Sequence, residues 1–373
     1  MKFGAFGNLA VPRPWTPGKE AQRYKEEIEI AVACDRAGYD YYWAPEHHFL
    51  EEYSHCSNSD TLLTAIAMVT ERIRLATGIM NICPPVNHPV KVAERIAMID
   101  ILSNGRVDLG TGRGSGSLEV NAFGVTNETS RSLWSEALDA IPRMWQDDLF
   151  SWDGEHFQMP ERSVLPKPVQ KPHPPIWVTG SNWSTASIAG QKGIGLAIFS
   201  FSSPESLAEP ISAYRAGIAE AKPVGAFVNN QVMSVQLCMC LEDGEKARQV
   251  FRDNYMWRIP FFSTYFDTIF PNPEPKPLPQ SRYRQLVEEA KNASNEGSIG
   301  TFGLDPDMIS RDFLLEQAIP VGDPDDVITV IKRYEAAGLD QLVLSPWIGP
   351  AEPHDLTLES IATVGRYVLP SFR

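Results

Sequence analysis

The hydrophobic pattern alternates between short apolar runs of strand length and longer segments with apolar residues at helical spacing. The strand-like runs are Lys2–Phe6, Tyr41–Ala44, Arg74–Ile82, Val107–Gly110, Ile176–Thr179, Leu196–Phe199, Gln231–Leu241 and Gln341–Leu344. The helical segments are Glu20–Ala37, Asp60–Thr70, Val90–Leu102, Ser130–Asp147, Ser184–Gln191, Pro204–Ala221, Gly244–Tyr255, Asp323–Ala337 and Leu356–Leu369, with Asp60 as a candidate cap. Strands that alternate with helices predict a parallel sheet, and eight strands favour a closed (β/α)8 TIM barrel over an open doubly wound sheet.

A recurring local unit supports this α/β prediction. A helix ends on a glycine and a short link leads into an apolar strand in DRAGYDYYWA, AGQKGIGLAIF and EAAGLDQLVL. A dinucleotide-binding fingerprint would instead favour the open sheet. The glycine run Gly110–Gly116 does not match that fingerprint, because Ser115 stands where its last glycine is required.

Two irregular segments interrupt the repeat. The first, Asp153–Pro175, is rich in proline, and the second, Met256–Pro320, is a long insertion with a dense group of aromatic residues. Long loops in a compact domain usually carry function or are disordered, and the aromatic residues argue against disorder. We therefore expect one barrel domain over residues 1–373, with inserted loops at the carboxyl end of the strands and residues 256–320 as a lid or pocket wall. An oligomer contact or an extra packing layer is the alternative for this insertion.

Charge and cysteine content exclude several classes of protein. The chain has 33 Lys and Arg against 47 Asp and Glu, a net charge of −14, and no basic run, so neither nucleic acid nor an anionic membrane is an expected partner. No apolar stretch approaches the ~20 residues of a membrane span, and the amino terminus lacks a signal-peptide core. Five sparse cysteines then indicate a reducing, cytoplasmic setting without a disulfide framework. The pair Cys238 and Cys240 is interpreted as two buried strand thiols, a C-x-C metal or redox pair being the alternative.

The densest polar cluster, Glu46-His47-His48, directly follows the second predicted strand. In a parallel barrel this is the carboxyl end, where active sites lie. Neighbouring side chains of an extended chain point to opposite sides, so at most one histidine is expected to face a pocket, and no metal site is predicted. A histidine there is a candidate general base, the alternative being two histidines that bond loop backbone groups. His88, before Pro89, is expected to lie in a helix cap.

Two further segments are candidates for phosphate binding. Arg113 lies within the glycine-rich run Gly110–Gly116, and the stretch Thr179–Thr185 places small polar residues at a predicted helix amino terminus. Taken singly, each segment has a purely structural alternative. The glycine-rich run could be a flexible loop, and the polar stretch could be an ordinary helix cap formed by Ser181, Asn182 or Ser184. Because the preceding strands are neighbours in barrel order, the two segments can converge on one phosphate.

Together these motifs resemble the bacterial luciferase-like flavin-dependent monooxygenases. The resemblance spans almost the whole chain and rests on PEHHF, TGIMNICPPVNHPVKVAER, IDILSNGRVDLGTGRG, WVTGSNWST and AAGLDQLVL. It implies a (β/α)8 barrel that binds reduced FMN at the carboxyl end of the strands, and a homo-oligomer.

The resemblance also implies residue roles. His47 corresponds to the active-site histidine that contacts or protonates the flavin–oxygen adduct, and Glu46 to its acidic neighbour. A non-proline cis peptide beneath the flavin would fall at Met80-Asn81. The FMN phosphate would be held by Arg113, Gly180, Ser181, Asn182 and Thr185.

The implied activity uses reduced FMN, supplied by a separate flavin reductase, and O2. A flavin hydroperoxide would then oxygenate a small organic substrate, which the composition of the insertion suggests to be apolar or aromatic. Luciferases proper have a cysteine where this chain has Gly112 and an acidic residue where it has Ser181, so long-chain aldehyde luminescence is not expected. The alternatives are a deazaflavin-dependent hydride-transfer oxidoreductase on the same barrel and a non-catalytic flavin-binding protein.

Overall fold

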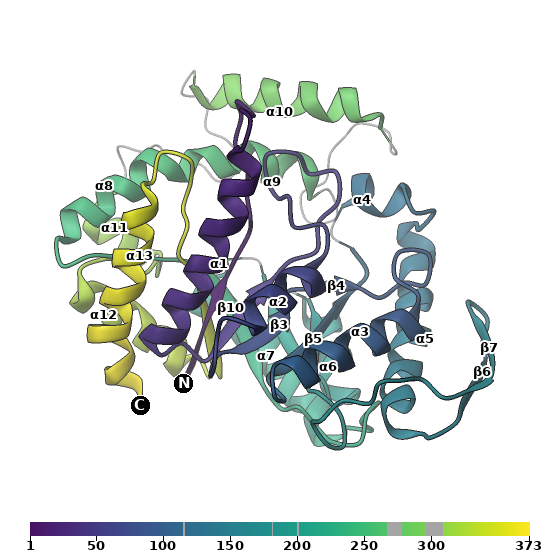
Figure 1. Cartoon of the computed structure of the whole chain (residues 1–373). Coiled ribbons are helices and arrows are strands. Elements are labelled where there is room, and N and C mark those ends of the chain that lie inside the picture. Colours follow the sequence, from purple (N-terminus) through teal and green to yellow (C-terminus); the bar gives the residue numbers. More distant parts are fainter. Residues whose placement is uncertain (115, 181, 200, 267–277, 296–308) are drawn as a thin grey trace.

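A closed parallel barrel forms the centre of the molecule (Figure 1). The computed structural model describes residues 1–114, 116–180, 182–199, 201–266, 278–295 and 309–373. The barrel strands are β1 (Lys2–Phe6), β2 (Tyr41–Ala44), β3 (Arg74–Thr77) with β4 (Met80–Asn81), β5 (Val107–Gly112), β8 (Ile176–Thr179), β9 (Gly195–Ile198), β10 (Val232–Leu237) and β13 (Gln341–Ser345). They pair in the order β3-β2-β1-β13-β10-β9-β8-β5-β4, and an additional β3–β5 pairing closes the barrel, as predicted.

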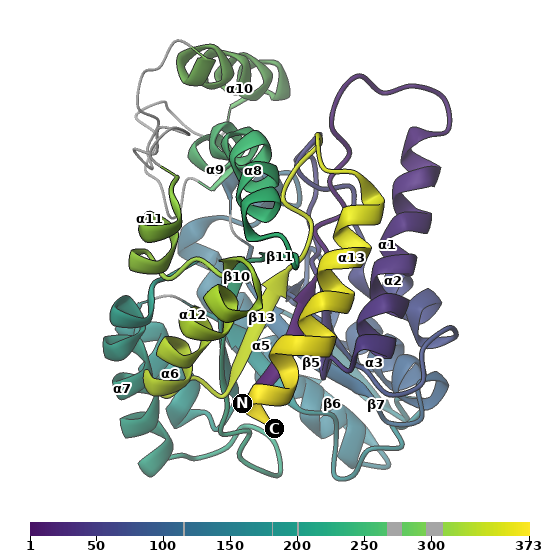
Figure 2. The same ribbon diagram turned by 90° about the vertical axis from the view of Figure 1, so that its left-hand side faces the viewer.

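Helices surround this barrel, as the two perpendicular views show (Figures 1 and 2). They are α1 (Lys19–Ala37), α2 (Ser59–Ala67), α3 (Pro89–Leu102), α5 (Asn127–Gln146), α6 (Trp183–Gln191), α7 (Pro204–Ala219), α8 (Gly244–Tyr255), α12 (Pro324–Ala336) and α13 (His354–Thr363). After α13 the chain continues as a π-helix (Val364–Val368) and a 3-10 turn (Leu369–Phe372). The cap of α2 is Asn58, whose Oδ1 accepts from the amide of Thr61 at 3.0 Å, so the prediction of Asp60 as cap was wrong.

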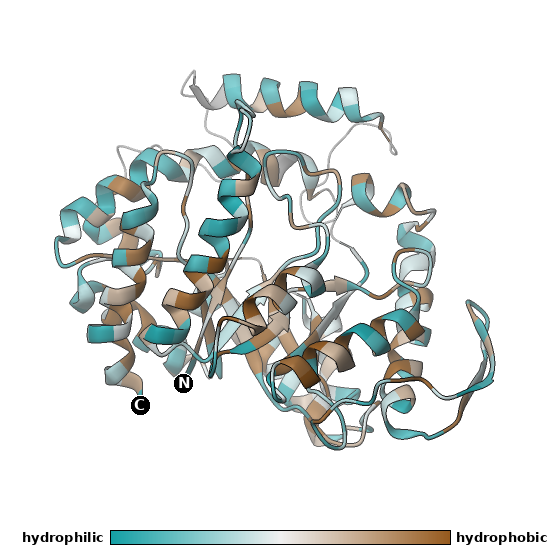
Figure 3. Ribbon diagram, viewed as in Figure 1, coloured by the Kyte–Doolittle hydropathy of each residue, from teal (hydrophilic) through white to brown (hydrophobic). Residues whose placement is uncertain are grey.

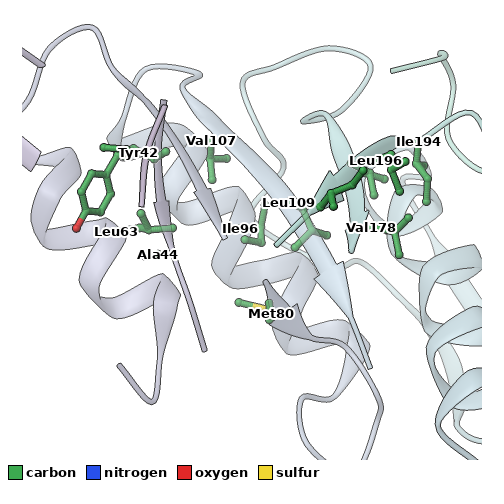
Figure 4. Close-up of a cluster of buried hydrophobic side chains, with 14 of the residues drawn as sticks. Tyr42, Ala44, Leu63, Met80, Ile96, Val107, Leu109, Val178, Ile194 and Leu196 are labelled. Atoms are coloured by element: carbon green, nitrogen blue, oxygen red, sulfur yellow. The ribbon is translucent and has the colours of Figure 1, made fainter. Parts of the chain in front are cut away.

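Two apolar layers hold the barrel together. Strand side chains that point outward pack against the helices, and Figure 4 shows part of this layer, including Met80, Ile96 and Leu109. Side chains that point inward, among them Trp43 and Trp177, fill the barrel itself. The hydropathy colouring accordingly concentrates apolar residues on the strands and on the inner helix faces (Figure 3).

Three predicted segments differ from the observed elements. The run Arg74–Ile82 is divided into β3 and β4, of which only β3 pairs with β2. The first part of the run Gln231–Leu241 forms barrel strand β10, whereas its last part, β11 (Met239–Cys240), pairs with β12 (Val321–Gly322) in a separate small sheet. The segment Asp153–Pro175, predicted to be irregular, supplies β7 (Gln158–Arg162), which forms an antiparallel hairpin with β6 (Phe150–Asp153) directly before it. Apolar periodicity alone does not determine with which strand a given segment pairs.

In the described part of the chain, five further helical segments, outside the repeat, lie at the carboxyl end of the strands, away from both chain termini (Figures 1 and 2). They are α4 (Ser117–Asn121), a 3-10 turn (Met256–Arg258), α9 (Ile259–Tyr265), α10 (Gln280–Asn295) and α11 (Arg311–Glu316). Apolar side chains of α9 and α10 pack with Leu50 and Tyr53 of the β2–α2 loop in a small separate core. Fully buried Arg258 anchors the start of this region, because its Nε donates to the Ile348 carbonyl at 2.7 Å.

All five cysteines are buried free thiols, including Cys238 and Cys240, as the sequence predicted for that pair. Within the part of the chain that the structure describes, no helix is long and apolar enough to cross a lipid bilayer.

Candidate active site

A cavity of about 440 Å³ opens at the carboxyl end of the barrel strands. Its walls come from the segments that follow β2, β4, β5, β8 and β9, from α4 and α5, and from α9. Of the residues predicted to form a site, the cavity brings together Glu46, His47, Asn81, Arg113, Gly180, Asn182 and Thr185. Ser181 lies outside the described residues.

His47 is held in one orientation by a buried carboxylate. Its Nδ1 lies 3.1 Å from Oε1 of Glu119, on α4, and its backbone amide donates to the Cys56 carbonyl at 2.9 Å. A carboxylate only accepts hydrogen bonds, so this contact places the proton on Nδ1 and leaves the lone pair on Nε2. The same Oε1 also accepts from the backbone amide of His48 at 2.9 Å. Glu119 therefore fixes both the tautomer of His47 and the course of the loop.

Glu46 is the centre of a second buried polar group. Its Oε1 accepts from Nδ2 of Asn87 at 2.9 Å and from the Asn81 amide at 3.3 Å, and it lies 3.6 Å from Nε2 of His48. Arg95 in turn donates from Nη2 to Oδ1 of Asn87 at 2.7 Å. This network joins the loops after β2 and β4, which form one side of the cavity.

Both histidines line the cavity, so the expectation that only one would face it was wrong. The chain is not extended there, because it bends at His48 and adopts a positive φ of 65° at Phe49. Each ring contacts a different set of aromatic side chains. His47 lies edge-on to Tyr53 and Phe266, with ring centroids 5.7 and 5.9 Å away, whereas His48 contacts Phe123 at 4.9 Å.

A group of cations and a helix amino terminus occupy another part of the cavity wall. Arg113 follows β5 and donates from Nη1 to the Ser130 hydroxyl at 2.8 Å, and Arg131 also lines the cavity. Burial and the like charge of Arg131 lower the pKa of the Arg113 guanidinium. Gly180 and Thr185 lie at the beginning of α6, where the Thr185 amide donates to the capping Oδ1 of Asn182 at 2.9 Å. Two guanidinium groups beside a helix amino terminus form a suitable anion site.

The predictions for the third strand need correction. Met80 lies in the core between barrel and helices (Figure 4), whereas Ile79 and Asn81 on either side of it line the cavity. Side chains along a strand alternate between its faces, which turns Met80 away from the site. The non-proline cis peptide is Gly78-Ile79 rather than Met80-Asn81.

Among the described residues, three charged residues of the cavity escaped the sequence reasoning: Glu119, Arg131 and Lys192. Glu119 follows the glycine-rich run by only a few residues, so its acidic side chain could have been predicted from the sequence to lie near the site. Arg131 and Lys192 lie on or just after amphipathic helices, where a charged residue normally indicates a solvent-exposed face. His88 caps α3 as predicted, accepting from the Val90 amide at 3.3 Å.

Within the part of the chain that the structure describes, this region contains no candidate metal centre. Among the described ranges, no three His, Cys, Asp or Glu side chains approach one another as metal ligands would. The polar groups of the cavity instead suit an organic cofactor that carries a phosphate.

Comparison with known proteins agrees with this fold. The luciferase-like monooxygenase family model matches residues 1–341, so the chain belongs to the luciferase-like monooxygenases, a family of flavin-dependent oxidoreductases. Over 380 aligned residues the chain is 26% identical to the oxygenase component of the flavin-dependent trigonelline monooxygenase of Acinetobacter baylyi, covering 100% of this chain and 96% of that protein.

Solved structures share the architecture at lower identity. The oxygenating constituent of 3,6-diketocamphane monooxygenase from Pseudomonas putida, in complex with FMN, superposes with a TM-score of 0.76 at 20% identity and covers 100% of this chain and 99% of its own. An F420-dependent secondary alcohol dehydrogenase gives a TM-score of 0.70 at 18% identity, with coverage of 100% and 99%. At such identities these structures establish the fold alone.

Proposed function

We propose that the protein is the oxygenase component of a two-component monooxygenase, which uses reduced FMN and O2 to oxygenate a small apolar or aromatic substrate. One observation carries this proposal: a single cavity joins the anion site around Arg113 to the oriented imidazole of His47. The similarity to the oxygenase component from Acinetobacter baylyi supports a separate flavin reductase as partner.

The residues present fit FMN. Arg113, Arg131 and the amino terminus of α6 would hold its phosphate. The apolar surface of Ile79, Val178 and Val235 suits a flat ring system. A Cβ atom at Gly112 would lie only 2.4 Å from Cδ1 of Ile79, so a side chain there would push Ile79 into the cavity. When bound, reduced flavin supplies the electrons that activate O2.

The chain itself supplies proton control and a screen against water. His47 exchanges a proton at Nε2, while its Nδ1–H donates to Glu119 and keeps the ring from rotating. Glu46 keeps the loops after β2 and β4 together. Phe262 of α9 and Phe266 directly after it form part of the cavity wall, which supports residues 256–320 as a pocket wall that limits the access of water.

The proposal is tested by flavin binding followed by turnover. We expect the protein to bind reduced FMN more tightly than riboflavin, because only FMN reaches the anion site. The Arg113→Ala variant should lose this preference while its affinity for riboflavin stays unchanged. With a flavin reductase and a substrate, O2 consumption should be coupled to product, and His47→Ala should uncouple them.

Titration with a reduced deazaflavin separates the main alternative. Tight binding of the deazaflavin, together with equal affinities for FMN and riboflavin, would contradict the proposal and favour hydride transfer. Flavin binding without reductase-dependent O2 consumption would favour a non-catalytic flavin-binding protein.

A further inference from the structure

The charged and aromatic residues of the cavity come from different parts of the barrel. Its Arg and Lys residues are Arg113, Arg131 and Lys192, from the end of β5, from α5 and from the end of α6. Two of them already have partners, since Arg113 bonds Ser130 and Lys192 pairs with Asp139 at 3.0 Å. In the proposed function this part of the cavity is taken by the cofactor phosphate.

Aromatic side chains dominate the remainder, which we call the aromatic end: Tyr53, Phe123, Phe201, Phe262 and Phe266, with the imidazoles of His47 and His48. These rings contact one another at centroid distances of 5.2 Å for Tyr53–Phe266 and 5.7 Å for Phe201–Phe262. Phe123 reaches the cavity from the turn after α4 and touches His48. Such surfaces bind flat rings by stacking and edge-to-face contacts.

The charged side chains that line the aromatic end are acidic. Glu46 and Glu119 both line the cavity, are less than 10% exposed and lie beside the two imidazoles, at 3.6 and 3.1 Å. This end is formed by the β2–α2 loop, by α4 and α9 with the residues directly after them, and by the segment after β9. No Arg or Lys among the described cavity residues comes from these segments. An anionic group bound here would be repelled by two carboxylates in a partly desolvated part of the cavity. A cationic group would instead be attracted by the faces of the aromatic rings.

We propose that the substrate is a planar aromatic compound whose ring carries no negatively charged group, held between His48, Phe123 and the two phenylalanines Phe262 and Phe266. This inference rests on the proposed function, because it assigns the cationic part of the cavity to the cofactor. Phe123 and Phe262 are then specificity-determining residues, and the enzyme discriminates against aromatic carboxylates.

The test uses three probes that share one ring: quinoline-3-carboxamide, its N-methyl cation and quinoline-3-carboxylate. Affinities are measured by calorimetry on the full chain loaded with oxidised FMN. We expect the neutral and cationic probes to bind at least tenfold more tightly than the carboxylate. Equal or tighter binding of the carboxylate, or no binding of any of the three, would overturn the inference.

Variants locate the site. Phe123→Leu and Phe262→Leu should each weaken the neutral probe about two- to tenfold, the range of one aromatic contact. Exposed Tyr367→Leu, outside the cavity, should leave the affinity unchanged. Unchanged FMN affinity in all three variants shows that they are folded.

The two proposals can fail separately. If FMN binds and O2 is consumed but the probes show no charge preference, this inference fails while the proposed function stands. Failure of FMN binding refutes the proposed function itself.

Discussion

Glu119 organises the candidate site with a single oxygen atom. That atom bonds the ring of His47 and the backbone of His48, and the side chain is buried. A carboxylate in this position sets which imidazole nitrogen carries the proton, and general acid–base catalysis depends on that choice.

We predict that Glu119→Gln lowers the rate of product formation about 10- to 100-fold, part of the 10²–10⁴ that acid–base catalysis contributes. The amide keeps the volume but also presents N–H donors, so it no longer selects one tautomer of His47. Steady-state product assays across pH 6–9 measure the effect. Exposed Glu128→Gln serves as the matched control, and an unchanged rate and pH profile in Glu119→Gln would refute the role.

Glu352 gives a second prediction at the scale of single residues. Burial raises its pKa to about 7, although hydrogen bonds from the Thr357 hydroxyl and the Ile348 amide lower it. The folded protein therefore retains a proton that the unfolded chain releases near its ordinary pKa, and stability must fall as pH rises from about 4.5 to 7. The loss amounts to about 3 kcal/mol, at about 1.4 kcal/mol per pKa unit.

Glu352→Gln should remove this fall, as seen by denaturant unfolding at pH 5 and pH 8. Exposed Glu359→Gln, on the helix α13 that follows Glu352, should keep the wild-type pH dependence. A pH dependence in Glu352→Gln equal to that of wild type would assign the effect to another group.

Among the elements, the sequence predicted the strands and helices of the repeat well, because each barrel strand is an apolar run between turn residues. It did not predict that Met239–Cys240 leaves the barrel, since pairing with β12 depends on residues far along the chain. The same limit applies to the site. Residues directly after strands, such as His47 and Arg113, were found from their position in the sequence. Arg131 instead reaches the cavity from a helix, and the apolar periodicity of that helix does not determine how it is rotated about its axis.

Ion pairs attach α10 to the loop that carries the histidines. Oε1 of Glu51 bonds Nε of Arg284 at 2.5 Å, and Oε1 of Glu52 bonds Nζ of Lys291 at 2.7 Å. Burial alone would raise the pKa of Glu51, but hydrogen bonds from Arg284 and Arg13 outweigh it and lower the pKa. The attachment by Glu51 is therefore complete at neutral pH and is lost as pH falls through this lowered value.

We predict that the double variant Glu51→Gln/Glu52→Gln raises amide hydrogen exchange across Gln280–Asn295 at least fivefold, at about 1 kcal/mol per pair. Exchange in the barrel strands should not change. Glu288→Gln, which removes only a pair within α10, is the control. Unchanged protection of α10 in the double variant would show that its apolar contacts suffice.

At the scale of the whole molecule, large apolar side chains are exposed at the ends of α2 and α3. Met68, Val69, Met98, Ile101 and Leu102 are each at least 40% exposed, and α3 shows this apolar surface in Figure 3. Exposed apolar surface of this kind is typical of a protein interface. The expected homo-oligomer would bury it between copies of the chain.

Sedimentation velocity should show self-association of the wild type and a shift towards monomer in the Met98→Lys/Ile101→Lys variant. Tyr367→Lys, on an exposed aromatic near the carboxyl terminus, should leave the sedimentation coefficient unchanged. A monomeric wild type at micromolar concentration would contradict the prediction.

The origin of the cavity walls has a consequence for how new specificities arise. The proposed proton and phosphate groups all come from the segment between β2 and α6, whereas Phe262 and Phe266 are supplied by the later insertion, which packs with Leu50 and Tyr53 in a core separate from that of the barrel. Recombination or drift within residues 256–320 can therefore alter which molecules are accepted without changing the reaction. Exchanging that segment between relatives is a direct route to redesigned oxygenases.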